Sequence, residues 1–412
     1  METETGLARR RFLAGGLGML PALQPQRVLG ANDRIRIGII GCGDRGRNAL
    51  MKEIIQFAGE TNAEITAICD TCRQQREQAT AMVKQTFQRE PRQFVHYQEL
   101  LALSDVDAVT IATPDHQHAT MLIAAARAGK DIYIEKPIAM TMKELVRAVD
   151  EVKKRARVVQ CGTQVRSFAN SAAARQFVSS GQLGKIFKVE QSRNSFKPYW
   201  HGFGERQVTE SDVDWRAFLM HRPYRAFNAD QYTAWYGYHE FSRGPHTNLM
   251  VHFIDLVHFI TGAKLPRRVM TLGGTYRWKD SRTAPDSVET VLEYPDEGML
   301  VRYCSVFGTN ANSYMRFFGT RGVLDTSNWW GEFKASGEGI REGDRIEKEM
   351  VLDPIPSTPH MKNWLECLRT RQQPNASIDA GYAQTVAVIM ADESYVRGKV
   401  VGYDPARRVL RA

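Results

Sequence analysis

The chain has 412 residues, of which 43% are hydrophobic and 25% are charged, and its formal net charge is +9. This length predicts two domains with a sizeable core, and the composition is that of an ordinary soluble globular protein. The charge is modest, and no basic run is interleaved with aromatic residues, which argues against a nucleic-acid partner.

The first 30 residues have the pattern of an export signal. The run Arg9-Arg10-Arg11 precedes an apolar stretch that is too short to anchor in a bilayer, and small residues near Ala31 offer a cleavage site. The alternative is a basic tail without a function. We expect residues 1–30 to be a Tat (twin-arginine) signal peptide and the protein to be periplasmic or otherwise exported. No other segment approaches transmembrane length, so the mature chain is not expected to span a membrane.

Six cysteines are present, and Cys42, Cys69 and Cys161 lie in or beside apolar strand-like runs that suit buried thiols. Cys69 and Cys72 have CxxC spacing, but no second pair accompanies them, so the sequence does not predict zinc. A protein that folds before export also needs no disulfide framework.

A strand, a glycine turn and a helix follow the signal. The apolar run Ile35 to Ile40 leads into Gly41-Cys42-Gly43-Asp44-Arg45-Gly46, and residues 48–55 resemble a helix. In G-x-G-x-x-G, the first glycine permits the tight turn, the second lets a diphosphate approach the backbone, and the third lets the helix pack closely. The alternative is a structural turn without a ligand.

The next strand, Ala63 to Cys69, ends in Asp70. An acid at this position is expected to bind the adenosine ribose hydroxyls and to repel a 2′-phosphate, so the sequence favours NAD over NADP. Arg73 and Arg76 follow directly and leave NADP open.

Strands and helices then alternate. Strands are predicted at 106–112, 132–134 and 156–161, and helices at 74–87, 119–128 and 142–154. This alternation predicts a doubly wound parallel sheet, an α/β Rossmann domain over residues 31–160.

The second of these strands ends in Glu135-Lys136-Pro137, where the proline forces the chain to turn. The carboxyl ends of parallel strands hold ligands, and a desolvated lysine there can exchange a proton near neutral pH. The alternative is a salt bridge at the surface. The preceding strand ends in a loop from Thr113 to His118, so its two histidines are expected near Lys136 and the nicotinamide. No acid or cysteine set completes a metal site around them.

Residues 161–412 predict a second domain. Strands at 186–192, 268–273, 287–294, 299–306 and 313–318 favour an open, mainly antiparallel sheet, whose free face suggests a homodimer or homotetramer. An aromatic loop from Tyr232 to Phe241 precedes a helix at 249–261. Asn248, His252 and Asp255 share one face of that helix. The alternative is that Asn248 caps the helix and His252 bonds to Asp255.

Together these motifs resemble the Gfo/Idh/MocA family, which includes glucose–fructose oxidoreductase and inositol dehydrogenase, over about residues 33 to 405. The resemblance rests on residues 41–46, Asp70, 113–118, 135–137, Gly162-Thr163-Gln164 and 248–255, with 319–322 and 360–367 near the C-terminus. It implies an NAD-binding Rossmann domain and a C-terminal α/β domain whose open sheet forms dimers or tetramers.

In that family the lysine of Glu-Lys-Pro lies beside nicotinamide and substrate, and an aspartate and a histidine four residues apart complete the usual site of inositol dehydrogenase-like members. The catalytic candidates are therefore Lys136 and His252. The substrate-binding candidates are Gln164, Arg166, Tyr236, Asn248 and Asp255. The cofactor-binding candidates are Gly41, Cys42, Gly43, Asp44, Arg45, Gly46, Asp70, Thr113, Pro114, His116, His118, Glu135 and Lys136.

The chain departs from that pattern at Asn248, where those members have the aspartate. An amide cannot take a proton, so acid–base chemistry must rest on Lys136 or His252. We expect an exported NAD(H)-dependent oxidoreductase that acts on a hydroxyl carbon of a sugar, polyol or glycoside and keeps its cofactor tightly bound. One alternative is a redox-neutral glycosidase or lyase, although that branch usually resembles Glu-Val-Pro. Another is a binding protein without turnover.

Overall fold

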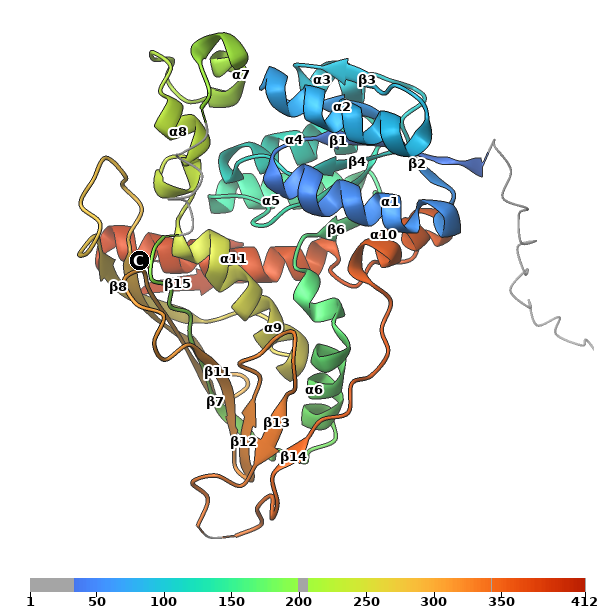
Figure 1. The fold of residues 1–412 in the computed structure, drawn as a ribbon. Coiled ribbons are helices and arrows are strands. Elements are labelled where there is room, and N and C mark those ends of the chain that lie inside the picture. The colour runs from blue at the N-terminus through green and yellow to red at the C-terminus, as the bar shows by residue number, and fades with distance from the viewer. Residues whose placement is uncertain (1–32, 199–206, 342, 412) are drawn as a thin grey trace, which may run out of the picture. The chain divides into compact units, whose positions relative to one another are not determined.

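A computed structural model describes residues 33–198, 207–341 and 343–411 (Figure 1). Its first sheet has six strands in the order β3-β2-β1-β4-β5-β6, and every neighbouring pair is parallel. The strands are β1 (Ile35–Ile40), β2 (Ala63–Cys69), β3 (Arg92–Phe94), β4 (Ala108–Ile111), β5 (Asp131–Ile134) and β6 (Val159–Cys161). The predicted doubly wound parallel sheet is confirmed.

The helices of this half are η2, a π-helix (Gly46–Met51), α1 (Lys52–Thr61), α2 (Arg73–Phe87), α3 (Tyr97–Leu101), α4 (Asp115–Arg127) and α5 (Met142–Lys154). The loop expected from Thr113 to His118 is wrong from Asp115 onward, because α4 begins at that residue. Pro114 precedes the first turn with an extended backbone, and an acid in that turn suits the positive end of the helix.

The second sheet has ten strands in the order β14-β13-β12-β11-β7-β10-β9-β8-β15-β16. They are β7 (Ile186–Ser192), β8 (Arg268–Gly274), β9 (Ser287–Tyr294), β10 (Met299–Val306), β11 (Tyr314–Gly319), β12 (Gly322–Asp325), β13 (Lys334–Ser336), β14 (Met350–Val351), β15 (Val401–Asp404) and β16 (Val409–Arg411). Within this sheet β7 and β10 pair in parallel and the other pairs are antiparallel, so the mainly antiparallel prediction is confirmed.

One face of this sheet packs against helices and the other is exposed. The packed helices are α9 (Val251–Thr261) and α11 (Ile378–Arg397), and α6 (Ala169–Ser179) packs against α9. Along β9 the side chains of Val288, Leu292 and Tyr294 are buried, whereas that of Val291 is exposed. This alternation with a period of two is what one buried face requires.

The C-terminal part of the chain also completes the first core. Helix α10 (His360–Thr370) packs against α1, and the ring of Trp364 lies 5.7 Å from that of Tyr133 on β5. All six cysteines are buried with free thiols, as expected for Cys42, Cys69 and Cys161. Among the described residues, no helix combines the length and apolar composition that a bilayer crossing requires.

The segments between α6 and β8 hold shorter elements, which are important for the site. These are η5 (Glu210–Asp212), α7 (Trp215–Leu219), α8 (Ala229–Thr233), η6 (Trp235–Gly237) and η7, a π-helix (His246–Met250) that runs into α9. A 3-10 helix, η3 (Gln164–Ser167), follows β6.

Candidate active site

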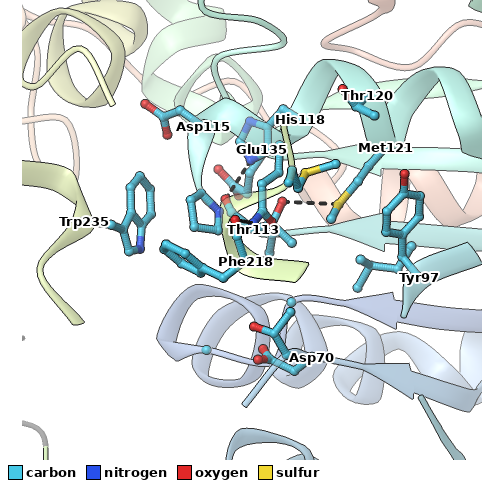
Figure 2. A pocket seen from close by; sticks show the side chains of 18 of the residues that line it. Asp70, Tyr97, Thr113, Asp115, His118, Thr120, Met121, Glu135, Phe218 and Trp235 are labelled. Atoms are coloured by element: carbon cyan, nitrogen blue, oxygen red, sulfur yellow. Dashed lines mark hydrogen bonds between the residues drawn. The ribbon is translucent and has the colours of Figure 1, made fainter. Parts of the chain in front are cut away.

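A cavity of about 940 Å³ lies at the carboxyl edge of the parallel sheet (Figure 2). Residues that follow β1, β2, β4 and β5 form its floor, and residues from the second half of the chain form its opposite wall. The floor residues are Gly41, Gly43, Asp44, Arg45, Asp70, Thr113, Pro114, Glu135 and Lys136. Its volume lies at the upper end of the range for small-molecule sites, which suits a dinucleotide with a second ligand.

The glycine turn at one end of the cavity fits a dinucleotide diphosphate. Gly41 has φ +90°, and a Cβ there would lie 2.5 Å from the carbonyl oxygen of Ala112. A Cβ on Gly46 would lie 1.9 Å from the carbonyl oxygen of Gly41, so the turn and the helix approach too closely for any side chain. Gly43 faces open space, which leaves the backbone accessible to a phosphate.

Asp70 is held in place by the backbone. Its Oδ2 accepts the N–H of Cys42 at 2.7 Å, and its Oδ1 accepts the N–H of Cys72 at 2.8 Å. Burial raises the pKa of this carboxyl, and the two N–H bonds oppose that rise. Each oxygen keeps a free lone pair, so the carboxylate can accept from the two ribose hydroxyls.

The arginines near Asp70 are engaged by protein acceptors. Arg76 Nη1 donates to the carbonyl oxygen of Asp70 at 2.7 Å, and Arg73 Nη2 lies 2.7 Å from Asp212 Oδ1. Arg47 donates to the carbonyl oxygen of Cys42 and to Gln75. These contacts favour NAD, because a 2′-phosphate would have to compete for each guanidinium.

Glu135 and Lys136 do not form the surface salt bridge that was the alternative for this strand end. Arg45 Nε lies 2.6 Å from Glu135 Oε1, and a Cβ on Gly162 would lie 2.7 Å from the same carboxylate. Lys136 Nζ instead donates to the carbonyl oxygen of Asn248 at 3.0 Å. Burial lowers the pKa of Lys136, while Glu135 and Asp115 act to raise it.

His252 and Gln164 also line the cavity, and His252 lies close enough to Lys136 for the charge of the amine to act on the imidazole. His252 Nδ1 and Gln164 Oε1 are both buried without a partner in the protein. Burial lowers the pKa of His252 well below its usual value, so the imidazole is neutral at neutral pH. Two buried polar atoms without protein partners at one cavity point to a ligand that hydrogen-bonds to them.

Two sequence models of one protein family match consecutive parts of the chain. Residues 35–163 match the oxidoreductase family NAD-binding Rossmann fold, and residues 175–402 match the C-terminal alpha/beta domain of the same family. The chain belongs to the Gfo/Idh/MocA oxidoreductase family. It is therefore an enzyme with an NAD-binding Rossmann domain, and its glycine turn and Asp70 fit that cofactor.

Curated relatives include glycosyl hydrolase family 109 proteins from Shewanella sp. (strain W3-18-1) and Shewanella putrefaciens. Each is 26% identical over 188 residues, which is 41% of this chain and 40% of the relative. The chain thus aligns with about two fifths of the length of these relatives.

Solved structures with the same fold cover most of the chain. Caulobacter crescentus aldose–aldose oxidoreductase, complexed with glycerol, has a TM-score of 0.69 and 19% identity over 90% of this chain and 99% of its own. The WlbA dehydrogenase of Bordetella pertussis, with NADH and UDP-GlcNAcA, has a TM-score of 0.68 and 20% identity over the same shares. A levoglucosan dehydrogenase with NADH has a TM-score of 0.67 and 17% identity, again over 90% and 99%. At these identities the likeness shows a common fold.

Asn248, at the position of the family aspartate, lines the cavity but directs its amide elsewhere. Asn248 Nδ2 donates to Ser242 Oγ at 2.7 Å, and the backbone carbonyl oxygen of Asn248 accepts from Lys136 Nζ. It does not cap the helix as the alternative reading held, because the helix begins one residue after Pro245 with the π-turn η7.

Arg166 and Asp255 lie together but are not among the residues that line the cavity. Arg166 Nη2 and Nε lie 2.5 and 2.8 Å from the two oxygens of Asp255, and the side chains are 9% and 1% exposed. The alternative bond between His252 and Asp255 is therefore absent, because Arg166 occupies the carboxylate. The pair ties η3 to α9.

The histidines of the Thr113–His118 segment point in different directions, because they lie on the first turn of α4. His118 lines the cavity, and its Nδ1 lies 2.7 Å from the carbonyl oxygen of Pro137. His116 is not among the lining residues; its ring packs against Phe218 and Phe241. Cys42 and Gly46 are not among them either.

Aromatic residues cover the cavity at the Lys136 end. The rings of Trp235 and Tyr236 stack with centroids 3.6 Å apart, and both residues line the cavity. Of this pair, Tyr236 was a substrate-binding candidate, and Trp235 was not.

A segment that the sequence did not predict crosses the cofactor end of the cavity; we call residues 208–221 the strap. At the β2 end, Asp214 N donates to the carbonyl oxygen of Thr71 at 2.9 Å. At the β4 end, the carbonyl oxygen of Phe218 lies 2.7 Å from Gln117 Nε2 and 2.9 Å from His116 Nε2. Residues between these attachments line the cavity, so the strap closes over it.

Proposed function

We propose that this enzyme transfers hydride between NAD and a hydroxyl-bearing carbon of a sugar, polyol or glycoside. The observation that carries the proposal is the position of Lys136, a partly buried amine in the same cavity as the dinucleotide turn and the unpartnered atoms of Gln164 and His252. The likeness in fold to solved sugar oxidoreductases supports the same substrate class.

In the proposed reaction the substrate loses a hydride from its hydroxyl-bearing carbon and a proton from the hydroxyl group, and each has its own acceptor. NAD, when bound, accepts the hydride from the hydroxyl-bearing carbon. Lys136 takes the hydroxyl proton as the C–H bond breaks and the carbonyl forms, and its lowered pKa makes the neutral amine accessible. His252 is the other candidate for the proton. A positioned base of this kind contributes ~10²–10⁴-fold to rate.

Substrate hydroxyls find partners on the opposite wall. Gln164 Oε1 accepts a hydrogen bond, and the neutral imidazole of His252 offers its unpartnered Nδ1 as donor or acceptor. The stacked rings of Trp235 and Tyr236 give an apolar surface for the C–H face of a sugar ring. Asn248 holds Lys136 through its carbonyl oxygen.

We further propose that the cofactor stays bound through the catalytic cycle. Residues of the floor and of the strap line the same cavity, so both would hold NAD in place and slow its release. The twin-arginine pattern lies outside the described residues; as an export signal it would send the folded enzyme to a compartment without a nicotinamide pool. The bound cofactor would then be regenerated in place by a second substrate or by the reverse half-reaction.

Export and assembly complete the proposal. The mature protein would be periplasmic or otherwise exported, and it would form a homodimer or homotetramer through the exposed face of the ten-stranded sheet. Exposed Val291 and Leu300 on that face support the assembly.

The test begins with cofactor content. Mass spectrometry of the denatured, ultrafiltered protein should find nicotinamide after desalting, and a panel of sugars and glycosides should change the fluorescence of the bound NADH. A cofactor-free preparation that works only with NAD at tens of micromolar or more, roughly −6 kcal/mol of binding, would contradict retention.

A redox-neutral glycosidase or lyase is the second candidate, and the similarity to glycosyl hydrolase family 109 proteins favours it. Lys136 opposes it, because the glycosidase branch usually resembles Glu-Val-Pro at this motif. Stoichiometry separates the two: net NADH equal to product supports the oxidoreductase. Product without net NADH, through a transient keto-sugar, supports the glycosidase.

A further inference from the structure

Asp115, which the sequence did not assign to the site, lies at the end of the strand beside the one that leads to Lys136. Strands β4 and β5 are parallel neighbours, with Ile111 opposite Ile134, so both chains turn at the same edge of the sheet. Asp115 lines the cavity, yet it is only 2% exposed (Figure 2). A carboxylate this deeply buried requires partners.

Its partners are next to those of Lys136. Thr247 Oγ1 donates to Asp115 Oδ2 at 2.7 Å, and Lys136 Nζ donates to the carbonyl oxygen of the next residue, Asn248, at 3.0 Å. The acid and the amine of two adjacent strand ends are therefore attached to consecutive residues of η7. This geometry fixes Asp115 and Lys136 relative to each other.

A directed chain of hydrogen bonds ends on the Asp115 carboxylate. The single hydrogen of the Thr247 hydroxyl goes to Asp115, and the Ser242 hydroxyl lies 3.2 Å from Thr247 Oγ1 and is a further hydrogen-bond partner of Asp115. Ser242 Oγ in turn accepts from Asn248 Nδ2 at 2.7 Å. Every donor points towards the carboxylate, which favours its ionised form.

Asn248 begins this chain of hydrogen bonds as a donor. The amide of Asn248 supplies a hydrogen, whereas an ionised aspartate could only accept. The amide at position 248 and the acid at position 115 are therefore compatible with each other.

We propose that Asp115 is the carboxylate that partners Lys136 in this site, in place of the aspartate that inositol dehydrogenase-like members carry at the position of Asn248. It is a positioning residue: it acts through Lys136, by setting how readily the amine gains and loses a proton.

Of the two acids that act on Lys136, Asp115 is the one that does not already form an ion pair with Arg45. The acids that act on Lys136 are Glu135 and Asp115, and Arg45 already forms an ion pair with Glu135 at 2.6 Å. Arg45 itself opposes the charged amine, as burial does, whereas the Cys161 thiol favours it slightly. His252 also faces Lys136 and is neutral; His118 faces Asp115. Removing the charge of Asp115 should therefore make the neutral amine more stable.

The inference rests on the proposed role of Lys136, but its test reads Lys136 directly and needs no substrate. The whole protein, labelled with ¹³C-lysine, gives a Cε resonance for Lys136 that is identified by its loss in Lys136→Met. Titration of this resonance with pH gives the pKa of the amine. Asp115→Asn should lower that pKa by about 1 unit or more, the size expected on losing an opposite charge at short range.

Two further variants make the result decisive. Asp296→Asn makes the same change in net charge at a side chain that is 81% exposed, and it should leave the pKa of Lys136 unchanged. Asp115→Ser keeps an acceptor for Thr247 and replaces Asp115→Asn if that variant does not fold. An unchanged Lys136 pKa in the folded Asp115 variant would overturn the inference. Full activity of Lys136→Met would instead overturn the proposed function, and the coupling of Asp115 to Lys136 would remain.

Discussion

Arg73 Nη2 lies 2.7 Å from Asp212 Oδ1, and this ion pair fastens the strap to the first turn of α2. Asp212 is nearly inaccessible, whereas Arg73 is half exposed and also contacts Glu77. The pair lies directly after Asp70, where the adenosine end of NAD is expected. The strap is thus closed by a contact that can be removed without altering the floor of the cavity.

Asp212→Asn should accelerate NAD release by roughly two- to fivefold, because partly exposed ion pairs contribute little individually. The off-rate is measured by displacing bound NADH with excess NAD and following the fluorescence. Glu77→Gln removes the other partner of Arg73 and is the matched control, for which no change is expected. Equal off-rates in Asp212→Asn and wild type would show that this contact does not close the strap.

Asp70→Ser should weaken NAD binding roughly ten- to a hundredfold, the effect of losing charged hydrogen bonds worth about 1.5–3 kcal/mol. It should weaken NADPH binding less, since the repulsion of a 2′-phosphate also disappears. Binding of NADH and NADPH to cofactor-stripped protein gives both affinities. A variant that keeps the wild-type preference for NADH would place the discrimination elsewhere.

Asp255→Asn should destabilise the fold by ~3–5 kcal/mol, because it leaves the Arg166 charge buried without its partner. The double variant Arg166→Met/Asp255→Leu should recover most of that loss. Urea unfolding measures both. Since neither residue lines the cavity, the double variant should keep the wild-type KM for any sugar identified in the panel. A large rise in KM with normal stability would restore their predicted role in substrate binding.

Stability should fall as the pH drops below about 6.5. His258 is buried, its Nε2 lies 2.9 Å from Tyr294 Oη, and burial lowers its pKa to about 3. An unfolded histidine takes up a proton near pH 6.5, and the folded one does so only near pH 3. Between about pH 6.5 and pH 3 the unfolded state therefore binds one more proton than the folded state. The contribution of His258 to stability is complete above this window and is lost progressively as the pH falls through it.

His258→Gln keeps a hydrogen-bonding side chain that does not titrate. It should therefore reduce the slope of unfolding free energy against pH by about 1.4 kcal/mol per unit in the middle of that window. His116 and His360 have pKa values of about 3 for the same reason, so part of the slope should remain. Urea unfolding at several pH values gives the slopes, and equal slopes for variant and wild type would be inconsistent with a neutral buried His258.

The sequence was informative where local pattern and fold coincide. The apolar runs of β1, β2 and β5, with the glycine turn and Asp70, identify a dinucleotide fold. Each of these features is needed at its own place along the chain, as a buried strand, a tight turn or an acid at a strand end. Short strands such as β14 cannot be predicted from the sequence, since two exposed residues show no hydrophobic periodicity. Trp364 of α10 joins the first core from the far end of the chain, and no local signal indicates that.

The candidate site could be predicted only in part, because local motifs indicate which residues take part but not their partners on distant elements. Four residues that the motifs singled out line one cavity: Lys136, Gln164, Asn248 and His252. It could not show that Arg166 holds the Asp255 carboxylate, because spacing along a helix says nothing about a partner on another element. Asp115 could have been found from its place between Pro114 and His116, at a strand end beside that of Lys136.

The central claim is that Lys136 moves the substrate proton while NAD remains in its site. The most direct measurement is a single-turnover experiment, in which a sugar identified in the panel is mixed with the cofactor-loaded enzyme and the bound NADH fluorescence is followed. Lys136→Met should retain the cofactor content of the wild type and slow this step ~10²–10⁴-fold. A near-wild-type rate with full cofactor content in Lys136→Met would contradict the account.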